Sequence, residues 1–115
     1  PITVFGDGRQ TRSSTYIADC VAGTVAALEG AEIGVVYNIG GGERIALLDV
    51  IGIIGDALGI TPDVRFGPAR DGDQRHTGAD TSRARTAFGF VPVWSPADGL
   101  RAQIYWHRSL RGGVA

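Results

Sequence analysis

A glycine-rich turn near the start of the chain has the spacing of a phosphate-binding loop. An apolar run, Ile2 to Phe5, leads directly into Gly6-Asp7-Gly8. Dinucleotide-binding folds begin with a strand and such a turn, where backbone N–H groups approach a pyrophosphate. That chemistry also needs a third glycine and a helix that begins at the turn. Position 11 is Thr, and no helical pattern begins before Ile17. We therefore do not expect this turn to bind a dinucleotide.

The same turn is typical of a hairpin, because glycine readily adopts the positive φ angles of tight turns. We predict a hairpin between strands at residues 2–5 and 12–16. Such a hairpin places Arg12 beside Phe5. An aromatic ring next to a guanidinium can stack a nucleobase while the Arg binds a phosphate.

A second group of candidate residues lies in the polar segment 67–76, GPARDGDQRH. Arg70 and Arg75 flank two carboxylates, Asp71 and Asp73. Guanidinium groups bind phosphate oxygens through paired hydrogen bonds, and a carboxylate accepts hydrogen bonds from ribose hydroxyls. From spacing alone, a charged loop that is simply solvated surface is the alternative interpretation.

The sequence lacks the residue patterns of metal sites and of nucleophilic active sites. His76 and His107 are the only His residues and lie far apart in the sequence, and no Cys or carboxylate completes the spacing of a metal site. Ser13, Ser14 and Ser82 have no recognisable nucleophile context. We therefore expect neither a metal site nor a catalytic residue.

Apolar periodicity and turn residues predict the elements that position these side chains. The expected strands are residues 2–5, 12–16, 35–39 and 63–66, and the expected helices are about 17–29, 47–58, 81–88 and 96–107. Because strands and helices alternate, we predict an α/β fold with a small mixed sheet and packed helices. No repeat or linker interrupts the 115 residues. We therefore predict one domain over residues 1–110 and a flexible tail at 111–115.

Net charge, hydropathy and cysteine content restrict the kinds of partner and compartment that we expect for this chain. The net charge is −1, so there is no general attraction to nucleic acid or to an anionic membrane surface. No apolar run reaches the roughly 20 residues of a membrane helix, and we expect no secretory leader. Cys20 is the single cysteine, which excludes an internal disulfide and favours the reducing cytoplasm.

Four segments, in this order, resemble the C-terminal half of extended short-chain dehydrogenases, the NAD-dependent sugar-nucleotide epimerases and dehydratases. They are ITVFGDGRQTRSSTYIADCVAGTVAAL, VVYNIGGGERIALLDVIGIIGDALG, VRFGPARDGDQRHTGADTSRARTAFGFVP and GLRAQIYWH. Together they cover about residues 2–108. Within this family, the resemblance is strongest to the UDP-glucose 4-epimerases.

The resemblance implies roles for five residues and a nucleotide-sugar as the partner, with a UDP-sugar preferred. Phe5 matches the residue that lines the nucleobase pocket, and Arg12, which closes GDG-x-Q-x-R, matches a diphosphate ligand. Arg70 of R-x-G-D matches the second diphosphate-binding Arg, and Asp73 matches the acceptor for a ribose hydroxyl. Thr77 falls near a position that shapes the hexose pocket.

The resemblance also implies chemistry that residues 1–115 do not carry. In the family, the N-terminal Rossmann half holds NAD and supplies a Tyr–Lys pair, whose Lys lowers the pKa of the catalytic phenol. This chain has no Lys, so it cannot contain that pair. It also has Ser13 and Ser14 where the family usually has an acidic and an aromatic residue. We expect NAD in the full-length parent, no cofactor site here, and the Rossmann half as the other wall of the cleft.

Three hypotheses follow. The first is a substrate-binding part of a nucleotide-sugar epimerase or dehydratase, present without its Rossmann half. The second is a non-catalytic binding or interaction module that retains the fold without the ligand, and the third is a gene fragment. Under the first, interdomain surface is left uncovered, and we expect self-association of the isolated chain.

Overall fold

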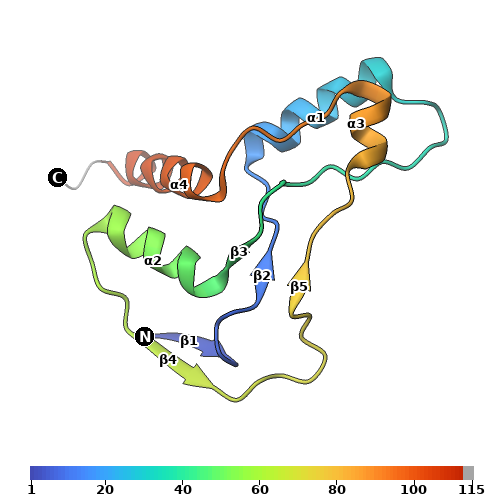
Figure 1. The fold of residues 1–115 in the computed structure, drawn as a ribbon. Coiled ribbons are helices and arrows are strands. Elements are labelled where there is room, and N and C mark those ends of the chain that lie inside the picture. Colours follow the sequence, from blue (N-terminus) through green and yellow to red (C-terminus); the bar gives the residue numbers. More distant parts are fainter. Residues whose placement is uncertain (113–115) are drawn as a thin grey trace.

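The computed structural model describes residues 1–112, and Figure 1 shows their arrangement. The predicted tail at 111–115 therefore falls, from residue 113 on, outside the described residues. The elements, in chain order, are β1 (Ile2–Phe5), β2 (Thr11–Arg12), α1 (Ile17–Gly30), β3 (Ile45–Ala46), α2 (Leu47–Leu58), β4 (Val64–Gly67), β5 (His76–Thr77), α3 (Ser82–Phe88) and α4 (Pro96–Leu110).

Two small sheets connect these helices. Strand β1 pairs in parallel with β4, from Ile2 opposite Val64 to Phe5 opposite Gly67. Strand β2 lies between β3, to which it is antiparallel, and β5, to which it is parallel. Helix α2 packs against α4, and α1 packs against α3. The α/β class and the mixed pairing are as predicted, although the strands form two sheets rather than one.

The predicted hairpin between residues 2–5 and 12–16 is wrong. Gly6 and Gly8 do have positive φ angles, 76° and 71°. However, the Gly6 N–H continues the β1–β4 ladder by donating to the Gly67 carbonyl at 3.1 Å. A Cβ on Gly8 would lie 2.5 Å from Cγ of Leu48, so the turn packs directly on α2. Local turn chemistry gave the glycine conformations but not the strand partner.

The four predicted helices are present, with ends close to those expected. Helix α4 begins with a capping interaction, in which Ser95 Oγ accepts from the Asp98 N–H at 3.1 Å. Asp80 satisfies the first turn of α3, because its Oδ1 accepts from the Ser82 N–H at 2.9 Å. Gly59 ends α2 in the left-handed region, with φ 68°.

The strand predicted at residues 35–39 does not form. Burial alternates along the segment: Val35, Tyr37 and Ile39 are half-buried, while Val36 and Asn38 are exposed. Within residues 1–112, however, no strand pairs with this segment. The sequence has the residue types and period of a strand, but a strand also needs a neighbouring backbone.

The molecule is a slab rather than a sphere, with Cα extents of 48 × 41 × 17 Å. Its radius of gyration is 16.9 Å, against about 13 Å for a compact domain of this length. Its accessible surface is 8098 Å², roughly 2,000 Å² more than a compact monomer of this mass exposes. Among the described residues, the buried apolar side chains are Val4, Ala84 and Phe90.

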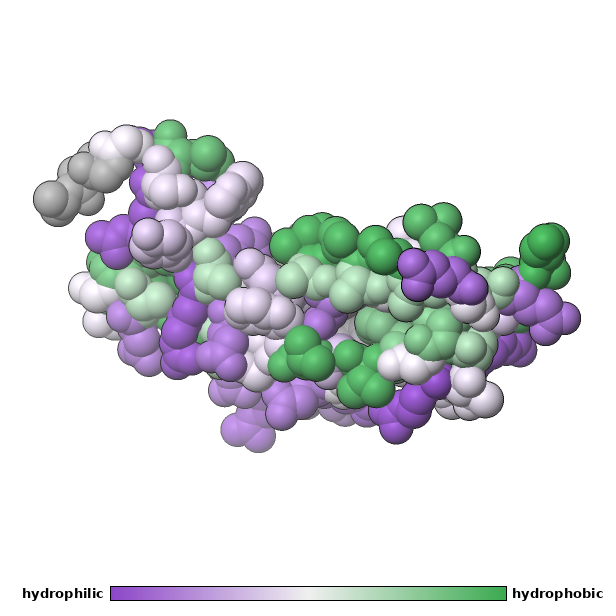
Figure 2. Space-filling model, turned by 90° about the horizontal axis from the view of Figure 1, so that it is seen from above, coloured by the Kyte–Doolittle hydropathy of each residue, from purple (hydrophilic) through white to green (hydrophobic). Residues whose placement is uncertain are grey.

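Helix α1 shows most clearly what this shape leaves uncovered. Its apolar stripe, Ile17, Val21, Val25 and Leu28, is between 52% and 84% exposed. Its buried residues are Asp19 and Gly23. Figure 2 looks down from the α1 side of Figure 1 and shows hydrophobic residues gathered across this face. The stripe that a globular protein buries therefore points to solvent in the chain alone.

In the part of the chain that the structure describes, no helix combines the length and hydropathy needed to span a bilayer.

Candidate functional site

A small cavity brings together two segments that lie far apart in the sequence. Strand β1 and the turn after it supply Phe5, Gly6, Asp7 and Gln10, and the loop between β4 and β5 supplies residues 69–70 and 73–75. The cavity has a volume of about 100 Å³. Of the predicted site residues, Phe5, Arg70 and Asp73 line it.

The cation that covers Phe5 is Arg70, not Arg12 as predicted. The central guanidinium carbon of Arg70 lies 3.5 Å from the centroid of the Phe5 ring. Strand β1 ends opposite Gly67, and a Cβ at Gly67 would be 3.2 Å from the ring carbon Cδ1 of Phe5. The missing side chain at Gly67 thus lets the Phe5 ring lie close to β4, and Arg70, three residues further on, reaches the ring.

A bidentate ion pair joins the loop to the turn. Nη1 and Nη2 of Arg75 donate to Oδ1 and Oδ2 of Asp7 at 3.0 and 2.9 Å. The hydrogen bonds from Arg75, followed by one from the Arg9 N–H, lower the pKa of Asp7. Both partners are about half exposed, so this pair orients the loop more than it stabilises the fold. Sequence reasoning named Arg75 but gave it no partner.

Arg12 and Thr77 form a second part of the candidate site. They lie opposite each other where β2 and β5 run in parallel. Arg12 is two residues beyond the cavity-lining Gln10, and Thr77 is two residues beyond Arg75. At the rise of an extended chain, this places them roughly 7 Å from the cavity residues. The Arg12 Nη1 donates to the Thr11 carbonyl at 2.8 Å.

The positive charges of the site differ in availability. Arg75 is paired with Asp7, whereas neither Arg12 nor Arg70 has an ion-pair partner among residues 1–112. Asp73, which lines the cavity, donates its backbone N–H to the Arg70 carbonyl at 3.3 Å. The tight turn Arg70–Asp73 therefore presents one guanidinium and one carboxylate on the same cavity.

The turn at Gly6-Asp7-Gly8 does not fit a dinucleotide. The chain continues from it into β2 rather than into a helix. The first N–H groups of α2, those of Leu47 and Leu48, donate to the Gln10 and Gly8 carbonyls at 3.1 Å, and the Asp7 carboxylate is held by Arg75. Backbone N–H groups at a helix start are what hold a pyrophosphate in such loops. For metals, residues 1–112 contain no group of three or more His, Cys, Asp or Glu side chains placed to hold an ion.

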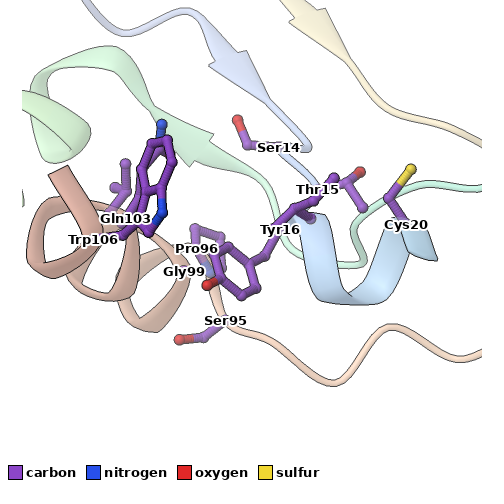
Figure 3. A pocket seen from close by; sticks show the side chains of 11 residues that line it. Ser14, Thr15, Tyr16, Cys20, Ser95, Pro96, Gly99, Gln103 and Trp106 are labelled. Carbon is purple, nitrogen blue, oxygen red and sulfur yellow. The ribbon is translucent and has the colours of Figure 1, made fainter. Parts of the chain in front are cut away.

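A larger hollow lies elsewhere, between the start of α1 and helix α4. Its volume is about 580 Å³ and its lining is mostly apolar. Figure 3 shows Tyr16 extending from the start of α1 toward Pro96 and Gly99, with Trp106 and Gln103 on the α4 side. None of the five predicted site residues lines it. The hollow opens on the apolar surface described above, since Ile17 and Trp106 are largely exposed.

Sequence reasoning missed this hollow, but one residue signals it. Gly99 lies inside α4, where glycine is unfavourable. A Cβ there would be 3.1 Å from Cβ of Tyr16, so glycine allows Tyr16 to pack on the helix. The Tyr16 ring also contacts Trp94, with ring centroids 4.4 Å apart. A glycine inside a predicted helix was therefore the available signal for a close approach.

Comparison with known proteins gives one consistent family. The sequence profile of the NAD dependent epimerase/dehydratase family matches residues 1–40. A Bacillus subtilis protein named as an uncharacterized UDP-glucose epimerase, YtcB, is 40% identical over 114 residues. A dTDP-glucose 4,6-dehydratase of Streptomyces griseus is 32% identical over 111 residues. The alignments cover 98% and 96% of this chain but 36% and 34% of those relatives.

Solved structures agree with the sequence matches. A UDP-glucuronic acid 4-epimerase from Bacillus cereus, in complex with UDP-glucuronic acid and NAD, is 43% identical with a TM-score of 0.85. The alignment covers 96% of this chain and 36% of that one. The chain thus spans about a third of the length of the proteins it resembles.

Proposed function

Because this chain belongs to the NAD-dependent epimerase/dehydratase family, we propose that it binds the nucleoside diphosphate of a nucleotide-sugar substrate. A UDP-sugar is the preferred ligand. Phe5 faces the base, Arg12 and Arg70 bind the diphosphate, Asp73 accepts from a ribose hydroxyl, and Thr77 borders the sugar.

The observation that carries this proposal is the meeting of Phe5, Arg70 and Asp73 on one cavity. These residues come from segments more than 60 positions apart, and each has a chemistry that one part of a nucleotide requires. An aromatic face stacks a base, a guanidinium pairs with phosphate oxygens, and a carboxylate accepts from a ribose hydroxyl.

The charge distribution supports the same ligand. Arg12 and Arg70 have no ion-pair partner among the described residues, so their charge is available to an anion. A planar guanidinium can contact two phosphate oxygens at once, which a single point charge cannot. Two such groups suit a diphosphate better than a single carboxylate.

The remaining chemistry belongs to residues outside this sequence. The chain has no Lys, so it cannot supply a Tyr–Lys pair, and its glycine turn does not fit NAD. In a complete family member, NAD exchanges a hydride with a sugar carbon while a base moves the proton. We propose that this chain contributes the substrate-binding wall of such a site and that a Rossmann unit contributes the other.

The test is an NMR titration of the chain with UDP and then UDP-glucose, following backbone amides. We expect shifts confined to Phe5, Arg12 and residues 70–77. Replacing Arg12→Gln removes one guanidinium, and the affinity for UDP should fall about tenfold, as expected for one charge-assisted hydrogen bond. The matched control is Arg65→Gln, since Arg65 is exposed on β4 and pairs with Asp63.

If UDP and UDP-glucose leave a well-dispersed spectrum unchanged, the proposal is wrong. The chain is then better described as a module that keeps the fold without the ligand. Equal losses of affinity in Arg12→Gln and Arg65→Gln also contradict it, because a general loss of positive charge would then explain the binding.

A further inference from the structure

Arg70 occupies the position that the proposed function gives to a nucleobase. Its guanidinium carbon lies 3.5 Å from the Phe5 ring centroid, which is a stacking distance. The ring also lies close to Gly67 of β4, where a Cβ would be 3.2 Å from Cδ1 of Phe5. A base therefore cannot stack under Arg70 unless that side chain first moves away.

Three contacts hold the loop that carries Arg70 against the opposite segment. Arg75 forms the bidentate ion pair with Asp7. The Thr11 N–H donates to the Arg75 carbonyl at 2.9 Å, and the Thr11 hydroxyl lies 2.8 Å from Nδ1 of His76. These contacts anchor the C-terminal end of the loop. Arg70, near its other end, has no polar side-chain partner among the described residues, so it can move while the anchor stays.

The cavity beside Phe5 is small with Arg70 in this position. Its volume is about 100 Å³, whereas pockets that bury a ligand of drug size have roughly 300 Å³ or more. The side chain able to enlarge it is Arg70, because it is exposed and touches Phe5 through the face of the ring.

We propose that Arg70 is a specificity-determining residue that covers Phe5 in the free chain and moves to the diphosphate when a nucleotide binds. The inference rests on the proposed function and adds a selection rule to it. A nucleoside must displace Arg70 from the ring, and it has no phosphate with which the displaced guanidinium could pair. A nucleoside diphosphate displaces the same side chain and provides a stronger partner for it. The site therefore selects against ligands that have a base but no phosphate.

The rule predicts opposite effects of one substitution on two ligands. In Arg70→Gln, the ring is uncovered but the phosphate loses a guanidinium. Exposed cation–π contacts are weak, so uridine should bind roughly two- to fivefold more tightly to the variant than to the wild type. UDP should bind at least tenfold more weakly. In a Phe5→Leu background, Arg70→Gln should no longer improve uridine binding, since there is no ring to uncover.

The experiment is an NMR titration of each variant with uridine and with UDP, read at the Gly67 amide beside Phe5. Arg65→Gln is the control and should change neither affinity, because Arg65 pairs with Asp63 on the exposed part of β4. A second readout needs no variant. The δ-protons of Arg70 should show upfield ring-current shifts in the free chain, and saturating UDP should remove them.

The outcomes separate the two ideas. If UDP binds the wild type but uridine binds Arg70→Gln no better than the wild type, the selection rule is wrong and the proposed function stands. Absent ring-current shifts in the free chain also overturn the rule. If the wild type binds neither uridine nor UDP, the proposed function fails and the inference fails with it.

Discussion

Among small side-chain changes in this chain, we expect the replacement of Asp19 to lower the free energy of unfolding most. It is 3% exposed on α1, and it carries the only buried polar side chain among residues 1–112. Its Oδ1 accepts from the Val93 N–H and its Oδ2 from the Trp94 N–H, both at 3.0 Å. The carboxylate thus fixes α1 to the segment that enters α4, where Trp94 contacts Tyr16.

The expected loss in the free energy of unfolding follows from these two hydrogen bonds. Removing the carboxylate in Asp19→Ala loses two hydrogen bonds to a charged group, each contributing about 1.5–3 kcal/mol. We therefore expect the free energy of unfolding to fall by about 3–5 kcal/mol. Asp19→Asn keeps one acceptor oxygen but turns an NH₂ group toward the other N–H, and should cost about 2 kcal/mol. The thin core makes such losses severe, because whole domains are stable by only about 5–15 kcal/mol.

Urea unfolding followed by tryptophan fluorescence measures these changes, and amide exchange at Val93 and Trp94 reports where they occur. Asp56→Asn is the matched control, since Asp56 is exposed on α2 and its change should stay within about 0.5 kcal/mol. An Asp19→Asn variant with wild-type stability and wild-type protection at both amides would refute the reasoning, because the carboxylate would then not hold this segment.

Two further predictions concern the ion pair and the apolar face. The pKa of Asp7 lies below its ordinary value of 3.8 because Arg75 hydrogen-bonds its charged form. The pair is therefore complete above that ordinary value and is lost as pH falls through the lowered pKa. A carboxyl ¹³C titration should show the midpoint rising toward 3.8 in Arg75→Gln, and an unchanged midpoint would contradict the assignment. For the apolar face, the roughly 2,000 Å² of surplus surface on one chain exceeds the about 800 Å² that each partner contributes to a standard interface, so the chain should self-associate in sedimentation velocity. The double variant Val21→Ser/Val25→Ser should weaken this association while Glu29→Gln leaves it unchanged, and a monomeric wild type at high concentration would show the expectation to be wrong.

The uncovered face of α1 shows how far periodicity can be trusted. The spacing of Ile17, Val21, Val25 and Leu28 predicted the helix, and the helix is present. Periodicity says that one face is apolar, but it does not say what covers that face. In this chain the covered face carries Asp19 and Gly23 instead. Similarly, residues 35–39 have the pattern of a strand without a neighbouring strand among the described residues.

For the candidate site too, the sequence predicted some features and only the structure showed the others. Motif order was sufficient to name Phe5, Arg12, Arg70, Asp73 and Thr77, and their roles remain predictions. The sequence did not indicate that Arg70 rather than Arg12 lies on Phe5, or that Arg75 pairs with Asp7. Both contacts join residues more than 60 positions apart. They depend on the parallel pairing of β1 with β4 and of β2 with β5.

The sequence by itself determined the helices, their ends, the left-handed glycines of the turns and the family. These properties depend on residues within a few positions of one another, or on motif order, and short-range sterics and hydrogen bonding decide the local ones. Only the tertiary structure decided which strands pair, which cation covers Phe5 and which face of α1 meets solvent. Those choices depend on long-range packing, because many pairings satisfy the same local preferences and only the assembled chain distinguishes them.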